Sequence, residues 1–142
     1  MKAFFDTSSL FKLYHHEAGT DILIEYFRKG EIEKIFVAEI TILEFSSVVW
    51  KKCRKGEIDM PLAVTLIENF VNDSAKFTFI AYDETLRNLA QQLIGKHWQI
   101  GLRTLDSLQL ASALRIVSEI SVFFTSDKLL AKIAELEGLK TI

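Results

Sequence analysis

The alternation of short apolar runs with longer, helically patterned segments constrains the fold of this chain more than any other feature. Buried strands are expected at residues 2–6, 35–38, 77–80, 121–124 and 139–142. Between these runs, apolar residues recur at three- and four-residue spacing, which is typical of helices with one buried face. Strands that alternate with helices predict a parallel sheet covered on both faces, with right-handed crossovers. We therefore expect a three-layer α/β/α fold and a single domain over residues 1–142.

Length and composition narrow the class of protein. The chain has 142 residues, of which 49% are hydrophobic and 25% charged, as in an ordinary soluble globular domain. No apolar run is long enough to span a membrane, and the N-terminal segment does not resemble a signal peptide. Cys53 is the lone cysteine and cannot form an internal disulfide, so a cytoplasmic location is expected. The net charge of −2 argues against a high-affinity DNA-binding module.

The stretch from Arg103 to Leu114 reads as a helix with one acidic residue near its start and an almost wholly apolar remainder. Thr104 is expected to cap this helix, which places Asp106 in the first turn, where the helix dipole favours a negative charge. Ala111 and Ser112 permit close packing against a sheet. Asp106 is a candidate for chemistry only if carboxylates from elsewhere in the chain meet it.

Two further acids follow predicted strands. Asp6 ends the first strand and Asp127 follows the fourth, in a segment where Thr125 or Ser126 is expected to cap the next helix. Ligands of open α/β sheets bind outside the carboxyl ends of strands, so both acids are candidates for ligand binding. Capping of the helix that follows is the alternative explanation for each of them. If the first and fourth strands are neighbours, Asp6 and Asp127 meet where the strand order reverses.

Glu44 is the most informative acid, because apolar residues surround it in the sequence and leave its helix little polar face. A buried carboxylate without a partner is unfavourable, so Glu44 is expected to meet a cation. A salt bridge to Lys51 is one interpretation, and a metal or functional role is the one that we favour. Clustered carboxylates without His or Cys suit hard ions such as Mg²⁺. The hydroxyls of Thr125 and Ser126 are expected to support the ligands from a second layer.

Four segments resemble the PIN domain, and within it the VapC-type toxins of bacterial and archaeal toxin–antitoxin pairs. The matching segments are Phe4–Leu10, Ile42–Phe45, Arg103–Ala111 and Phe124–Asp127, which occur in the family's order. The resemblance implies a sheet in the order 3-2-1-4-5. It also implies that Asp6, Glu44, Asp106 and Asp127 form an acidic site for Mg²⁺ or Mn²⁺, with Thr125 as the family's hydroxyl residue beside the fourth acid.

The resemblance further implies a metal-dependent endoribonuclease that leaves a 5′-phosphate and a 3′-hydroxyl on cleaved RNA. It implies a homodimer and an antitoxin protein that fills a groove and blocks the acids. Three other interpretations stay open: a PIN-type nuclease of RNA processing or turnover without an antitoxin, a phospho-acceptor or Mg²⁺-binding signalling domain, and a non-catalytic acidic module in which Glu44 neutralises a basic side chain. The signalling domain would need adjacent acids after the first strand, and the sequence has only Asp6 there.

Overall fold

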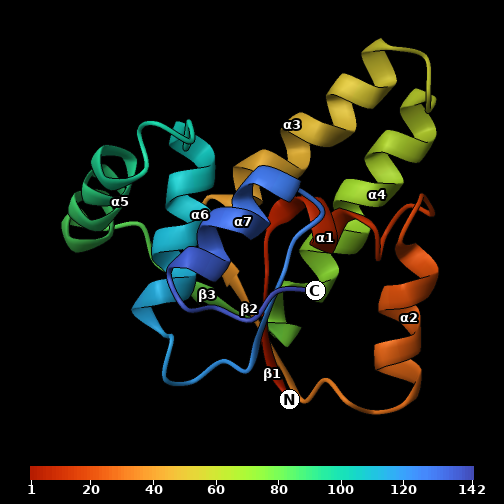
Figure 1. Cartoon of the computed structure of the whole chain (residues 1–142). Coiled ribbons are helices and arrows are strands. Elements are labelled where there is room, and N and C mark those ends of the chain that lie inside the picture. Colours follow the sequence, from red (N-terminus) through yellow and green to blue (C-terminus); the bar gives the residue numbers. More distant parts are fainter.

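The computed structural model describes residues 1–142 and consists of one sheet with helices on both of its faces (Figure 1). The strands are β1 (Lys2–Phe5), β2 (Lys34–Ala38), β3 (Phe77–Ile80) and β4 (Val122–Phe124). The helices are α1 (Thr7–Phe11), α2 (Thr20–Arg28), α3 (Thr41–Arg54), α4 (Met60–Asp73), α5 (Glu84–Lys96), α6 (Thr104–Arg115) and α7 (Lys128–Leu136), with a 3-10 turn, η1, at Ser74–Lys76. The expected α/β class is confirmed.

All strand pairs are parallel, and the strands lie in the order β3-β2-β1-β4. The prediction of a fifth strand was wrong. The final segment lies beside β4, as the order 3-2-1-4-5 requires, but it forms only one isolated bridge, between Thr141 and Phe123. The Leu139 N–H still donates to the Ala134 carbonyl in the closing turn of α7, at 3.0 Å. The few residues left after that turn make too short a ladder to count as a strand.

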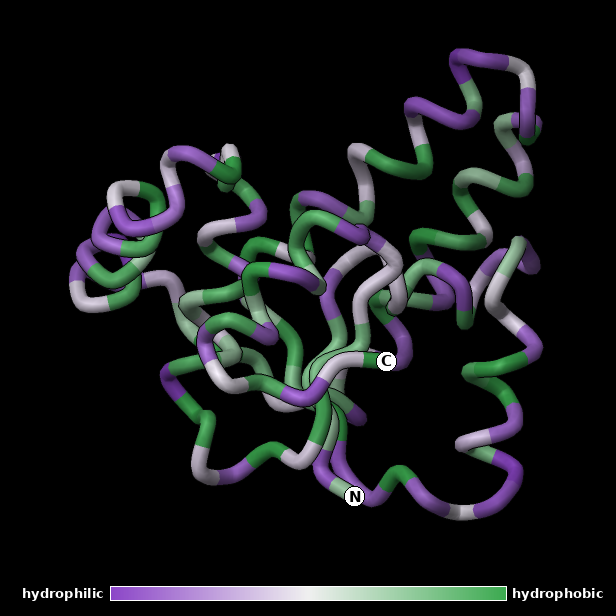
Figure 2. Tube along the Cα trace, in the orientation of Figure 1, coloured by the Kyte–Doolittle hydropathy of each residue, from purple (hydrophilic) through white to green (hydrophobic).

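Alternate residues of the central strands fill two separate cores, as the two-residue period of a strand requires. Phe4 of β1 and Phe123 of β4 pack on the face covered by α5, α6 and α7, with ring centroids 5.4 Å apart. Phe5 and Phe124 pack on the opposite face, beneath α1 to α4, with centroids 4.5 Å apart. Figure 2 shows the hydrophobic strands at the centre and the hydrophilic connection between α3 and α4 at the outer tip. The helices cover the two faces of the sheet and leave the ends of its strands uncovered.

Aspartates cap many of the helices, which partly corrects the predictions made for the caps. Asp6, Asp59, Asp83 and Asp127 stand before α1, α4, α5 and α7, and each side chain accepts a hydrogen bond from a backbone N–H of the first turn. Asp127 therefore has the capping role expected of Thr125 or Ser126. Thr104 is not a cap, because α6 begins at Thr104 after Arg103, which makes no capping bond. No helix has both the length and the apolar composition needed to cross a bilayer.

Candidate active site

The site begins where β1 and β4 end side by side, at the point where the strand order reverses. Asp6 directly follows β1, and its N–H donates to the carbonyl of Phe124, the last residue of β4, at 3.1 Å. Thr125 follows β4 and donates its hydroxyl to Asp6 Oδ2 at 2.5 Å. The predicted meeting of the first and fourth strand ends is confirmed. The parallel register thus brings residues 119 positions apart in the chain into direct contact.

Asp6 is buried and surrounded by neutral donors. Its Oδ1 accepts from the Ser9 N–H at 2.9 Å and from the Ser8 hydroxyl at 2.7 Å. The backbone N–H of Ser126 donates to the Ser8 hydroxyl at 3.1 Å, so Ser126 supports Asp6 through its backbone and not through its hydroxyl. Burial raises the pKa of Asp6 to about 6, although these hydrogen bonds lower it and the charge of Asp106 raises it further.

Glu44 reaches the site from the first turn of α3 and is half-buried. Its Oε1 accepts from Gln109 Nε2 of α6 at 2.8 Å and from the Thr7 hydroxyl at 3.2 Å. No basic side chain lies within ion-pair distance of Glu44, so the suggested salt bridge to Lys51 is wrong. Burial raises the pKa of Glu44, and the charge of Asp106 adds to this, while the bonds from Gln109 and Thr7 oppose it.

The environment of Glu44 also differs from the apolar setting that the sequence suggested. Leu43 is 68% exposed and Ile42 is 49% exposed, so these two apolar neighbours of Glu44 lie on the surface and do not enclose its carboxylate. Only one face of α3, carrying Thr41, Phe45 and Val49, is buried. A run of apolar residues cannot reveal which of its members face a neighbour and which face solvent.

Asp106 lies in the first turn of α6, as predicted, and Arg103 links it to Asp127. The Arg103 guanidinium stands 3.6 Å from Asp106 Oδ2 and 3.7 Å from Asp127 Oδ2. The Arg103 side chain is 75% exposed, so it covers the two acids from the solvent side. Burial raises the pKa of Asp106, the charge of Asp127 raises it further, and Arg103 partly offsets both effects.

Asp106 is the electrostatic centre of the four acids. Its charge raises the pKa values of Asp6 and Glu44, and the charge of Asp127 raises that of Asp106. The four side chains come from the end of β1, from α3, from α6 and from the start of α7. Glu44 and Asp106 line a common hollow of about 620 Å³. Charge interactions with Asp106 therefore link the other three acids that the sequence singled out.

The donor set suits a hard divalent cation, because the converging groups are carboxylates without His or Cys. Glu44 Oε2 and Asp106 Oδ1 have no protein partner, while Asp127 uses Oδ1 to cap α7 and shares Oδ2 only with Arg103. As the side chains stand, no three His, Cys, Asp or Glu residues are close enough to hold one ion together. The chemistry of the residues thus fits a metal, and the fit requires side-chain movement.

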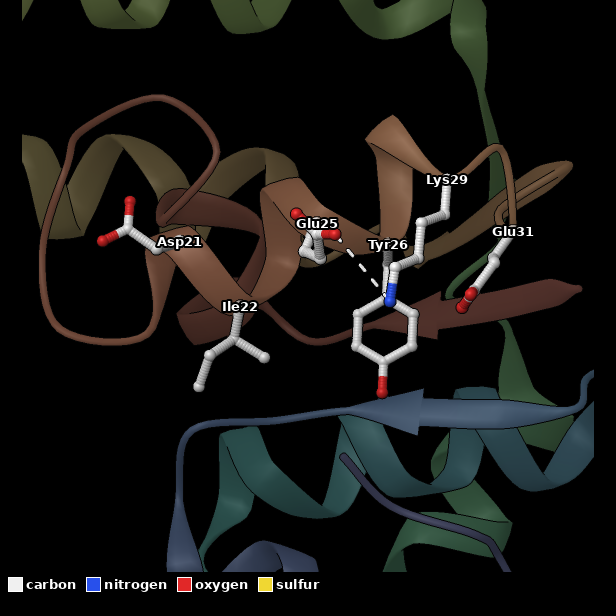
Figure 3. Close-up of a pocket in the computed structure, with 6 residues that line it drawn as sticks. All are labelled: Asp21, Ile22, Glu25, Tyr26, Lys29 and Glu31. Carbon is white, nitrogen blue, oxygen red and sulfur yellow. Dashed lines mark ion pairs between the residues drawn. The ribbon is translucent and has the colours of Figure 1, made fainter.

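A second hollow, of about 550 Å³, lies against α2 and contains none of the four acids (Figure 3). Asp21, Glu25 and Glu31 give it an acidic lining, and Ile22 and Tyr26 give it apolar surface. Figure 3 shows that Glu25 pairs with Lys29, at 3.8 Å. Ile22 also lines a smaller hollow that reaches Thr125 and Ser126. Ile22 is therefore common to the hollow against α2 and to the hollow beside Thr125 and Ser126.

Gln109 and Ser8 contact the acids, although sequence reasoning gave neither of them a role. Gln109 is a buried amide on an apolar helix, one turn after Asp106, and this combination was a usable signal. Ser8 gave no such signal, because serine after a strand-ending aspartate is ordinary turn chemistry. Arg103, which lies close to Asp106 in the sequence, pairs with Asp106 and Asp127.

Comparison with known proteins agrees with this architecture. VapC20 of Mycobacterium tuberculosis, a sarcin–ricin loop cleaving toxin, aligns with a TM-score of 0.70 at 13% identity, over 92% of this chain and 94% of that chain. FitAcB of Neisseria gonorrhoeae aligns with a TM-score of 0.69 at 14% identity, over 99% of this chain and 96% of that chain. VapBC2 of Rickettsia felis, bound to a promoter DNA fragment, aligns with a TM-score of 0.64 at 15% identity, over 100% of this chain and 98% of that chain.

At these identities the likeness shows the fold, which is that of VapC-type structures. No curated protein sequence matches the chain. The sequence itself matches the PIN domain over residues 3–136, a span that contains all four acids and the strands that position them. The chain belongs to the PIN domain family.

Proposed function

We propose that this protein is a metal-dependent endoribonuclease of the VapC toxin type. The observation that carries the proposal is the convergence of four carboxylates around Asp106 at the strand-order reversal, with unpartnered oxygens on Glu44 and Asp106. Acids that raise one another's pKa are unfavourable in a merely structural cluster, and a divalent cation relieves that repulsion. Membership of the PIN family and the VapC-type fold support the same function.

Asp6, Glu44, Asp106 and Asp127 are the proposed ligands of Mg²⁺ or Mn²⁺. Bound there, such an ion lowers the pKa of water and stabilises the charge that develops on a phosphate during cleavage. Asp6 is held rigidly by Ser9 and Thr125, so it forms the fixed part of the site. Asp106 is the adjustable part, because its only partner is the exposed Arg103, whereas Asp127 is also held by the bond that caps α7. Movement of Arg103 frees both carboxylates and places a cation near the substrate phosphate.

RNA is the proposed substrate, and the resemblance to a sarcin–ricin loop cleaving toxin supports this choice. The chain carries a net charge of −2, so its overall charge weakly repels a nucleic acid. Contact with RNA would therefore be local and brief, through groups such as Arg103 at the rim of the hollow. A single unpaired cysteine fits a reducing cytoplasm as the place of action.

An antitoxin is the proposed protein partner, and FitAcB and VapBC complexes among the similar structures support it. The hollow against α2 offers a place for a peptide with apolar and basic side chains, since Ile22 is 63% exposed and three acids line the hollow. We propose that a peptide lying there extends past Ile22 toward Thr125 and Ser126, which line the neighbouring hollow. Failure of the protein to bind any such peptide would favour a PIN-type nuclease of RNA processing without an antitoxin.

A homodimer is proposed through the apolar surface beside the acidic site. Leu43 and Leu105 line one small hollow there, and Ile42 and Tyr82 line the next along α3. All four side chains are at least 47% exposed, and such adjoining apolar surface is typical of an interface. Leu43→Glu is expected to give a monomer by light scattering, whereas Val117→Glu, an exposed change outside these hollows, is expected to leave the dimer intact. A wild-type monomer would refute the assembly.

The test of function is cleavage of a panel of tRNA, rRNA and single-stranded RNA with Mn²⁺ or Mg²⁺. The protein is purified through denaturant and refolded, so that no bound antitoxin masks the site. Wild type is expected to cleave at least one RNA, and both EDTA and Asp106→Asn are expected to abolish cleavage. Asp59→Asn is the matched control, because Asp59 caps α4 outside the acidic cluster and asparagine caps equally well. Absence of both cleavage and Mn²⁺ binding would leave a non-catalytic acidic module.

A further inference from the structure

Gln109 is a buried amide that joins three helices at the acidic site. It lies one turn beyond Asp106 on α6 and is 2% exposed. Its Nε2 stands 2.8 Å from Glu44 Oε1, 2.9 Å from Thr41 Oγ1 and 3.1 Å from Thr7 Oγ1. Thr7 belongs to α1, while Thr41 and Glu44 belong to α3. This one side chain therefore connects α6 to both helices that flank the site.

The carboxylate of Glu44 determines which way the amide of Gln109 faces. A carboxylate only accepts hydrogen bonds, so the amide must present its donating nitrogen to it, and the reverse orientation would set two acceptor oxygens against each other. The consequence is visible at the other end of the amide, where Gln109 Oε1 is buried and accepts no hydrogen bond. A buried carbonyl without a donor is destabilising, and an apolar side chain of similar size avoids that loss. An amide at this position is therefore explained by what Nε2 contacts.

Glu44 depends on Gln109, since its other contact is shared. The Thr7 hydroxyl lies 3.2 Å from Glu44 Oε1, but it also lies 2.9 Å from the Thr41 hydroxyl. The hydrogen bond from the Gln109 amide to Glu44 Oε1 is shorter, at 2.8 Å, and no basic side chain pairs with this oxygen. With Oε1 held in this way, Oε2 is the oxygen of Glu44 that is left for a ligand in the hollow shared with Asp106.

We infer that Gln109 is a positioning residue, which fixes Glu44 through Oε1 so that Oε2 faces a divalent cation beside Asp106. The inference rests on the proposed function, because it requires Glu44 to be a metal ligand. A positioning role predicts that metal affinity changes without a change in the stability of the metal-free protein, whereas a purely structural role predicts that both change together. Loss of the amide should weaken metal binding while leaving the metal-free fold intact.

The test is the Mn²⁺ dissociation constant of Gln109→Met, measured by titration calorimetry, together with urea unfolding in EDTA. Met keeps the length of the side chain and removes the donor. The dissociation constant is expected to rise roughly 10- to 100-fold, the usual effect of losing an outer partner of a metal ligand. The urea midpoint in EDTA is expected to stay close to that of wild type, because loss of the unsatisfied oxygen offsets loss of the bond to the half-buried Glu44. Gln109→Leu replaces Gln109→Met if the latter does not fold.

Two comparisons show whether Gln109 acts through Glu44. Ser112→Ala is the matched control: Ser112 is also buried on α6 and donates its hydroxyl to the Leu108 carbonyl, so its loss should leave the dissociation constant unchanged. In a Glu44→Gln background, Gln109→Met is expected to cause no further weakening, because the group it positions is already absent.

The outcomes separate this inference from the proposed function. Wild type that binds Mn²⁺ and loses it on Asp106→Asn, but not on Gln109→Met, would overturn the role of Gln109 and leave the function standing. Equal weakening by Gln109→Met in the wild-type and Glu44→Gln backgrounds would also overturn it. Wild type that binds no Mn²⁺ would refute the metal site itself, and the role of Gln109 with it.

Discussion

Asp6 and Asp83 each cap a helix, but their pKa values are shifted in opposite directions. Each caps a helix with Oδ1, at 2.9 Å from the N–H of Ser9 for Asp6 and of Leu86 for Asp83. Asp83 is exposed and meets both guanidinium nitrogens of Arg115, at 2.9 and 2.6 Å. The bonds from Arg115 hold the pKa of Asp83 below its ordinary value. Asp6 is buried among neutral donors, and burial raises its pKa to about 6.

The difference shows what distinguishes a site residue from a structural one in this fold. The cap fixes the direction of the side chain in both cases, but only Asp83 is given an opposite charge by the protein. Asp6 is placed beside further acids and no cation, so its ionised form is unfavourable until a ligand supplies the positive charge. Such an arrangement is costly for folding and useful for binding a metal.

Replacement of Asp6 should have the largest effect. Asp6→Asn is expected to abolish Mn²⁺-dependent cleavage, because a ligand is lost, yet to make the metal-free protein more stable at neutral pH. A rise in pKa from 3.8 to about 6 corresponds to about 3 kcal/mol, which is the upper limit of the gain. Urea unfolding in EDTA measures the gain, and cleavage assays measure the loss. A less stable Asp6→Asn protein would contradict the burial argument.

The metal-free protein should lose stability as the pH rises. Because the native state holds the Asp6 proton more tightly than the unfolded chain does, this contribution to stability is complete below pH 3.8 and is lost as the pH rises through about 6. Glu44 and Asp106 have raised pKa values and act in the same direction. Urea midpoints in EDTA should fall over this range, and they should fall less in Asp6→Asn. Saturating Mn²⁺ should stabilise the protein at the upper end, because it binds the ionised acids.

Replacement of Asp83 should show the opposite pattern, with a smaller effect. Asp83→Asn keeps the cap but loses the ion pair with Arg115, so a modest fall in Tm and no change in cleavage are expected. The contribution of Asp83 is present above the ordinary pKa of an aspartate and is lost as the pH falls below it. The difference in Tm between this variant and wild type should therefore be present at neutral pH and disappear at acidic pH. Reduced cleavage by Asp83→Asn would break the distinction between the two caps.

Removal of the one cation at the site should have the smallest effect. Arg103→Gln takes a guanidinium from beside Asp106 and Asp127, where it competes with a metal. Arg103 is 75% exposed, so the change in metal-free stability should stay below about 1 kcal/mol. The Mn²⁺ dissociation constant is expected to fall by up to about 5-fold, which is the change in affinity that corresponds to about 1 kcal/mol. Weaker binding in calorimetry would mean that Arg103 helps to hold the site and does not compete for it.

The sequence predicted those parts of this protein that depend on local patterns. Apolar runs between helical segments predicted the four strands and their helices. Acids at strand ends and in the first turn of α6 predicted which carboxylates would converge. The final strand was over-predicted, since pairing depends on how many residues remain after the turn that closes α7. Periodicity is a local property that a single sequence carries, whereas the strand order was implied by the resemblance to the PIN domain.

Only the tertiary structure decided what each acid meets. Gln109 and Thr7 reach Glu44 across 65 and 37 positions of the chain, and Thr125 reaches Asp6 across 119. Whether a carboxylate is held by an amide, a hydroxyl or a guanidinium depends on packing between elements and leaves no local pattern to read. Burial, which raises the pKa of Asp6 while Asp83 stays exposed, is likewise a property of the assembled layers. The sequence therefore supplied the carboxylates, and the packing of helices on the sheet gave each of them its charge environment.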